Sequence, residues 1–133
     1  EAKVAHVEMD EHGLIPERLR EAISSLRSQG RKIKFLYLIP NYQNPAGVLL
    51  PAERRVEILE ICREAGIFIV EDNPYGLLGF DKPSPNAMRS LDSENVIYLG
   101  SFSKTIGNQS QIFCTQPIGR WLRTKLIRFK KPC

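Results

Sequence analysis

The sequence predicts an α/β fold with a mostly parallel sheet and flanking helices. Three short apolar runs, at 35–39, 67–70 and 96–99, have the length and composition of buried strands. Segments with helical periodicity lie before the first run and between the first and second runs. This alternation is typical of right-handed strand–helix–strand crossovers, which place parallel strands side by side.

The first predicted helix begins at Pro16, because proline is well accommodated at the first helical position. Leu19, Ile23 and Leu26 follow at helical intervals and define one apolar face. Gly30 provides the expected end of this helix.

A second helix is predicted over 51–66, where proline opens the segment and glycine closes it. Val56, Leu59 and Cys62 form its expected apolar stripe, and charged residues occupy other positions. The segment therefore connects the first two predicted strands as an amphipathic helix.

The predicted strands are uniformly apolar rather than alternating. The run at 35–39 reads FLYLI and the run at 67–70 reads IFIV. Such runs suit strands that are buried on both faces of a parallel sheet. The connection at 73–95 is polar and rich in proline, so its helical signal is weaker.

Length and composition indicate a globular protein. The chain has 133 residues, of which 42% are hydrophobic and 26% charged, as in ordinary globular domains. No stretch reaches the roughly 18 to 20 apolar residues that span a bilayer. The first residues lack the pattern of a signal peptide, so we expect a cytoplasmic location and no membrane partner.

The net charge of +4 is distributed unevenly along the chain. Residues 1–94 hold 12 Lys and Arg against 15 Asp and Glu, whereas residues 95–133 hold seven basic residues and no acidic one. The basic excess therefore belongs to the C-terminal part. We do not expect nucleic acid as a partner of the slightly acidic main body.

Cysteine and histidine spacing gives no sign of a metal site or a disulfide framework. The three cysteines, Cys62, Cys114 and Cys133, are widely spaced and form no CxxC pair. We expect reduced thiols, with Cys62 packed as a small apolar side chain on its helix. The two histidines, six residues apart, share no helix face.

Polar side chains follow all three predicted strands. The clusters lie at 40–47, 71–76 and 101–105. In open α/β sheets, ligands bind beyond the carboxyl ends of the strands. We therefore expect an amide, a carboxylate, a phenol, hydroxyls and a lysine to share one cleft.

Each of these residues alone also has a purely structural explanation, such as a turn, a cap or a solvated side chain. Their order and spacing favour a functional interpretation. The carboxylate of Asp72 follows the amide of Asn44 by 28 residues, Tyr75 follows Asp72 by three, and Lys104 follows it by 32.

The three clusters together resemble the large domain of the class I and II aminotransferases, which are pyridoxal-phosphate (PLP) enzymes of fold type I. The matching pieces are 43–47 (QNPAG), 72–75 (DNPY) and 101–104 (SFSK). The surrounding sequence is similar to the branch that contains the aminoadipate and kynurenine aminotransferases. The resemblance runs from about residue 14 to Ile106 and covers only part of that domain.

The resemblance implies the chemistry of two residues above all. Lys104 would form the Schiff base with the aldehyde of PLP and act as the general acid and base of the reaction. Asp72 would lie beside the pyridine nitrogen and keep it protonated, so that the ring can accept electrons.

The resemblance also implies the remaining cofactor contacts. Asn44 and Tyr75 would donate hydrogen bonds to the phenolic oxygen of PLP, and Ser101 and Ser103 would bind its phosphate. Residues 42–43 lie near enough to line the substrate pocket, but they receive no role here.

The sequence departs from the family pattern after Ile106. The family's phosphate-binding arginine would fall near Gln111, which supplies no positive charge. We therefore divide the chain into a partial aminotransferase large domain, 1–106, and a divergent basic tail, 107–133. The substrate-carboxylate arginine of the family also belongs to a segment that this sequence does not include.

The origin of the tail leaves two hypotheses open. A shifted reading frame or splice junction would explain the loss of the family pattern and of acidic residues. Alternatively, its cations and interleaved apolar residues could form an amphipathic helix that binds nucleic acid or acidic lipid. We favour an artefact or a solvated helix face over a binding role.

The sequence favours PLP-dependent transamination between an amino acid and a 2-oxo acid, carried out by a longer enzyme of which this chain is a segment. We expect such an enzyme to be a homodimer, as the resemblance implies. Two alternatives remain open, which are the effector-binding domain of a PLP-dependent transcription regulator and an inactive truncated fragment. Other fold type I reactions share the same three motifs.

Overall fold

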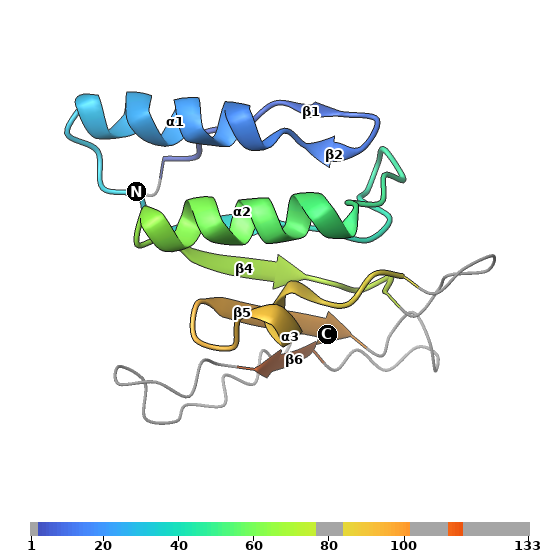
Figure 1. Ribbon diagram of the computed structural model, residues 1–133. Coiled ribbons are helices and arrows are strands. Elements are labelled where there is room, and N and C mark those ends of the chain that lie inside the picture. Colours follow the sequence, from blue (N-terminus) through green and yellow to red (C-terminus); the bar gives the residue numbers. More distant parts are fainter. Residues whose placement is uncertain (1–2, 77–83, 102–111, 116–133) are drawn as a thin grey trace, which may run out of the picture.

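In the computed structural model, a four-stranded sheet carries helices on one of its faces (Figure 1). The structure describes residues 3–76, 84–101 and 112–115. The helices are α1 (Pro16–Ser28), α2 (Ala52–Glu64) and α3 (Met88–Leu91). The sheet contains β3 (Phe35–Leu38), β4 (Phe68–Asp72), β5 (Val96–Ser101) and β6 (Ile112–Thr115). A separate short hairpin consists of β1 (Met9–Asp10) and β2 (Gly13–Leu14).

The sheet has the strand order β3-β4-β5-β6. The first three strands are parallel and β6 runs antiparallel to β5, so the predicted mostly parallel sheet is confirmed. Its strands start and stop within two residues of the expected positions. β6 lies beyond residue 106, where the sequence predicted a tail and no strand. The division into 1–106 and 107–133 stays a prediction.

Both long helices end in the same glycine-dependent motif. Gly30 and Gly66 adopt left-handed backbone conformations, with φ of 68° and 62°. After α2, the amide of Gly66 bonds to the carbonyl of Arg63 and the amide of Ile67 to that of Cys62. This Schellman arrangement satisfies carbonyls at the helix end, and the predicted stops at both glycines are confirmed.

Helix α2 is buried on a wider face than its apolar spacing predicts. It packs against α1 on one side and β4 on another, so Leu59 and Cys62 are buried as expected. Val56, which was expected on the same stripe, is 46% exposed. Arg55 takes its place in the interior. The side chains that form the core include Leu19, Ile23, Leu38, Ile58, Leu59, Cys62, Ile69, Met88 and Val96.

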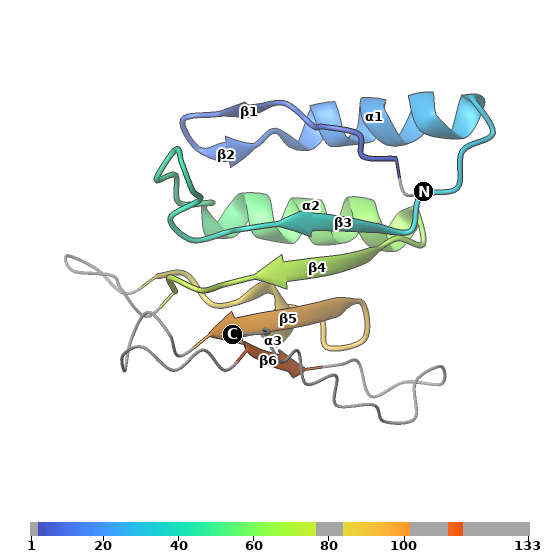
Figure 2. The same cartoon turned by 180° about the vertical axis from the view of Figure 1, so that it is seen from behind.

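The opposite face of the sheet carries no helix within the described residues. Figure 2, seen from behind, shows β3 in front of α2. Phe35 and Tyr37 on β3 are 53% and 52% exposed, and Phe68 on β4 is 45% exposed. The expectation that these strands are buried on both faces is therefore wrong for the described part of the chain. An apolar strand is covered only where a second layer packs on it.

The hairpin and α3 are held by polar contacts to the main layer. Arg54 of α2 donates two hydrogen bonds to the carboxylate of Asp10, at 2.6 and 2.7 Å. Glu71, fully buried on β4, accepts hydrogen bonds from the amides of Met88 and Arg89 at the start of α3. The described helices include none that is long and apolar enough to cross a membrane.

Candidate functional site

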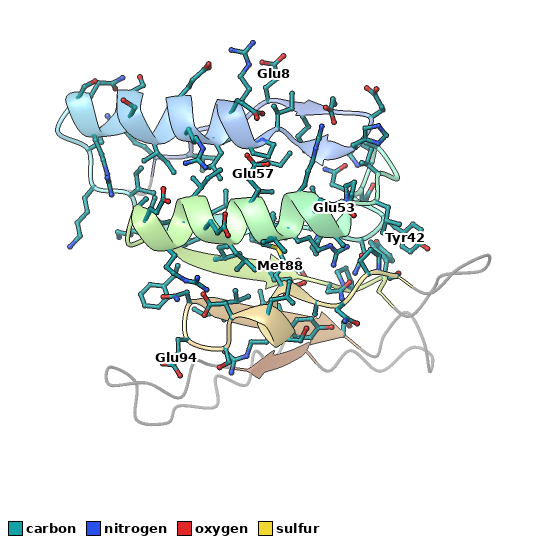
Figure 3. The ribbon with its side chains drawn as sticks, in the orientation of Figure 1. Glu8, Tyr42, Glu53, Glu57, Met88 and Glu94 are labelled. Carbon is teal, nitrogen blue, oxygen red and sulfur yellow. The ribbon has the colours of Figure 1, made fainter. Side chains whose placement is uncertain are left out.

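The carboxyl ends of β3, β4 and β5 lie together at one end of the sheet. Because the strands are parallel, the loops that follow β3 and β4 leave the sheet on the same side as the last residue of β5. Asn41, after β3, donates a hydrogen bond of 2.9 Å to Asn73, after β4. Asn73 in turn donates one of 3.3 Å to the hydroxyl of Tyr98 on β5. Figure 3 labels Tyr42, which lies at this end of the molecule.

Asp72 ends β4 and is half-buried. The hydroxyl of Tyr37 on β3 donates a hydrogen bond of 2.6 Å to one of its carboxylate oxygens. Burial and this carboxylate raise the pKa of Tyr37 to about 12. Among the described residues, no other hydrogen bond reaches the Asp72 side chain.

Neighbouring residues at the end of β4 point to opposite faces of the sheet, as alternation along a strand requires. Asp72 shares a face with Tyr37, whereas Glu71 points toward α3. Burial raises the pKa of Glu71, and the two amides of α3 and the charge of Arg55 oppose that rise. Glu71 therefore fixes the start of α3 and lies on the opposite face of the sheet from Asp72.

A buried arginine holds the loop after β3. Arg55 is fully buried and donates a hydrogen bond of 2.6 Å to the side chain of Asn41. Its other donors reach four backbone carbonyls, those of Pro40, Leu50, Pro85 and Asn86. Burial lowers the pKa of Arg55, and the negative charge of Glu71 partly offsets this lowering. The side chain of Asn41 thereby has both its acceptor and its donor occupied, as a buried amide needs.

Asn44 and Tyr75 lie on the two loops at this end of the sheet. Asn44 is exposed within the turn at 43–47, where the side chain of Gln43 accepts a hydrogen bond from the amide of Ala46. Tyr75 is half-buried in the turn that follows Asp72. The structure brings both residues to the carboxyl end of the sheet, but no hydrogen bond joins either side chain to Asp72.

The last predicted cluster is described only at its start. Ser101 is the final residue of β5 and is half-buried. Ser103 and Lys104 lie outside the described residues, as does Gln111. Four of the six predicted site residues thus lie at the same end of the sheet, namely Asn44, Asp72, Tyr75 and Ser101.

Two residues that support this end of the sheet, Arg55 and Tyr37, were not predicted from the sequence. Arg55 precedes Ile58, Leu59 and Cys62 at helical spacing, so it lies on the same face of α2 as these apolar residues. This spacing could have indicated that Arg55 is buried. The role of Tyr37 depends on the register between β3 and β4, where Tyr37 lies beside Val70. No signal within one strand specifies such a register.

Comparisons with known proteins agree with this fold. A sequence model of the family described as aminotransferase class I and II matches residues 1–114. The mitochondrial kynurenine/alpha-aminoadipate aminotransferase of Bos taurus is 41% identical over 120 residues, which cover 84% of this chain and 28% of that protein. The match extends past Ile106, where the resemblance was expected to end.

Two solved structures share the architecture. An archaeal alanine:glyoxylate aminotransferase superposes with a TM-score of 0.81 at 32% identity, over 88% of this chain and 29% of that one. A kynurenine aminotransferase of Pyrococcus horikoshii, solved with PMP, superposes with a TM-score of 0.69 at 40% identity, over 77% and 25% of the two chains. The chain thus spans between a quarter and a third of the length of each of these three proteins. It belongs to the class I and II aminotransferase family.

Proposed function

We propose that this chain forms the cofactor-binding part of a PLP-dependent aminotransferase, which moves an amino group between an amino acid and a 2-oxo acid. The observation that carries the proposal is the position of Asp72. Its carboxylate lies at the carboxyl end of the parallel sheet with one oxygen held by Tyr37 and the other without a partner among the described residues. The family match and the enzymes described above favour this function over a transcription regulator.

The donor set fits PLP. A carboxylate suits a protonated ring nitrogen, an amide and a phenol suit a phenolate oxygen, and a serine hydroxyl suits a phosphate. Asp72, Asn44, Tyr75 and Ser101 supply these groups from one end of the sheet. When bound, the cofactor supplies an electron sink for the pair released at the substrate α-carbon.

The residues of the chain then have separate tasks. Asp72 would keep a proton on the pyridine nitrogen, and Asn44 and Tyr75 would donate hydrogen bonds to the phenolic oxygen. Ser101 and Ser103 bind the phosphate as neutral donors. Lys104 would hold the cofactor through its Nζ atom, and its amine, when free, would carry a proton away from the substrate α-carbon.

The proposed partners are an amino acid, a 2-oxo acid and, for the full-length protein, a second identical subunit. The relatives described above are named for kynurenine, α-aminoadipate and alanine. An amino acid of this range is the first donor to assay. Sedimentation of the full-length protein tests the dimer.

The decisive test is chemical trapping in the full-length product of the gene. Borohydride reduction in the presence of PLP, followed by peptide mass analysis, is expected to locate a phosphopyridoxyl group on Lys104. Lys104→Ala is expected to abolish both the adduct and the visible absorbance of the bound cofactor. Lys34→Ala is the matched control, since Lys34 is exposed and precedes β3. An adduct confined to other lysines would show that the proposal is wrong.

A further inference from the structure

The geometry points to Tyr37 as a positioning residue that orients the Asp72 carboxylate toward the bound cofactor. This inference rests on the proposed function, because Asp72 is the residue proposed to contact the pyridine nitrogen. Tyr37 would touch neither cofactor nor substrate and would act only through Asp72.

The contact follows from the register of the sheet. Tyr37 lies beside Val70 in the parallel pair, and Asp72 is two residues further along β4. All three side chains therefore share the face that carries no described helix. The phenol of Tyr37 therefore reaches diagonally across the strand pair to Asp72, a distance that a long aromatic side chain can span.

The contact is a hydrogen bond to a charged acceptor. At 2.6 Å, it has the length expected for a hydroxyl that donates to a carboxylate. Tyr37 is 52% exposed, so its hydroxyl could instead have been solvated. Holding it on Asp72 restricts rotation of the carboxylate and engages one of its two oxygens.

The phenol is suited to a fixed donor role. Because burial and the carboxylate raise its pKa to about 12, Tyr37 keeps its proton throughout the pH range in which an enzyme works. The Asp72 carboxylate therefore keeps the same hydrogen-bond donor at every such pH. A carboxylate held in this way needs less reorganisation when the ring nitrogen binds.

The test measures PLP affinity of the full-length product of the gene in four forms. They are the wild type, Tyr37→Phe, Asp72→Ala and the double variant, each titrated with PLP after removal of cofactor. Tyr37→Phe deletes one oxygen and keeps the ring. We expect it to raise the dissociation constant of PLP about tenfold and to lower kcat more than it changes the substrate KM.

The double-mutant comparison separates positioning from general structure. If Tyr37 acts through Asp72, Tyr37→Phe has no further effect on the dissociation constant in the Asp72→Ala background. Phe35→Leu, which alters a ring on the same strand and face, is the control and is expected to leave PLP affinity unchanged.

Each outcome has a distinct meaning. Equal PLP affinity of wild type and Tyr37→Phe, or the same loss in both backgrounds, would overturn the inference and leave the proposed function standing. A wild type that binds no PLP would overturn both. A loss of PLP affinity that Tyr37→Phe causes only when Asp72 is present, at an unchanged melting temperature, would support both.

Discussion

Arg55 Nη2 donates a hydrogen bond of 2.6 Å to Asn41 Oδ1, and this contact joins the buried face of α2 to the loop that follows β3. Asn41 in turn donates a hydrogen bond to the side chain of Asn73, the residue that follows Asp72. One guanidinium on a helix thus supports both loops that carry the proposed cofactor contacts. Arginine suits this position because it presents five donors in a fixed plane.

Replacement of Arg55 by methionine is expected to destabilise the chain by about 3 kcal/mol or more. The substitution removes the guanidinium donor from five oxygen acceptors. The contacts to Leu50, Pro40 and Asn41 are buried, although the Pro40 carbonyl keeps a hydrogen bond from the amide of Leu50. Each buried polar group left unsatisfied costs about 1–3 kcal/mol before relaxation. Urea unfolding followed by circular dichroism measures the change.

The matched control is Arg63→Met on the same helix. The Arg63 side chain is 58% exposed and pairs with Asp92, which keeps hydrogen bonds from Glu94 and Asn95. The Asp92 side chain is only 5% exposed, but it keeps these hydrogen bonds and the Arg63 guanidinium is largely solvated, so we expect a smaller loss of about 1 kcal/mol. Equal losses for the two variants would contradict a special role of Arg55.

The elements of the fold could be predicted where local chemistry decides them. Pro16 at the start of α1 and Gly66 after α2 mark helix ends through their own backbone preferences. The three parallel strands follow from apolar runs. The four-residue strand β6 and helix α3 could not be predicted in this way, because each depends on a tertiary partner: β5 for β6 and Glu71 for α3.

The residues of the candidate site also differ in whether local sequence or tertiary contacts determine their roles. Asp72 is predictable because it follows an apolar strand and belongs to a specific motif. The role of Tyr37 could not be predicted, because it depends on the register between β3 and β4. That register brings Tyr37 into contact with Asp72, which lies 35 residues further along the chain. The burial of Arg55 could not be predicted either. A charged side chain is buried only where several acceptors surround it, and those acceptors come from distant loops.

Asp10 is expected to make the stability of the chain depend on pH below 4. The hydrogen bonds from Arg54 lower its pKa from 3.8 to about 2, and the amide of His12 assists. A lowered pKa in the folded state means that the ionised form stabilises the fold. This contribution is complete above the unfolded pKa and is lost as pH falls from about 4 to 2.

The measurement compares the wild type with Asp10→Asn by urea unfolding between pH 7 and pH 2. The stability difference is expected to be constant near neutrality and to shrink toward pH 2. Glu21→Gln, which removes an exposed pair with Arg18, is the control and should change stability little. A difference between wild type and Asp10→Asn that persists at pH 2 would contradict the role of the Asp10 carboxylate.

Cys62 is expected to resist alkylation in the folded chain. Its side chain is 1% exposed, which confirms the predicted packing on α2, and burial raises the pKa of the thiol to about 12. Only the thiolate reacts, so iodoacetamide at pH 8 would modify Cys62 only after unfolding. Peptide mass mapping with and without urea gives the result. Rapid labelling of Cys62 without urea would show that α2 opens readily.

The isolated 133-residue chain is expected to bind PLP weakly or not at all. Asp72, Asn44, Tyr75 and Ser101 supply neutral donors and one carboxylate, and Gln111 stands where the family resemblance implies an arginine for the phosphate. A neutral amide stabilises a dianion much less than a guanidinium does, because it supplies one hydrogen bond and no charge. Gel filtration of the chain with PLP, monitored by visible absorbance, tests this, and Gln111→Arg is expected to increase the retained cofactor. Stoichiometric retention by the unaltered chain would show that the phosphate is held by other residues.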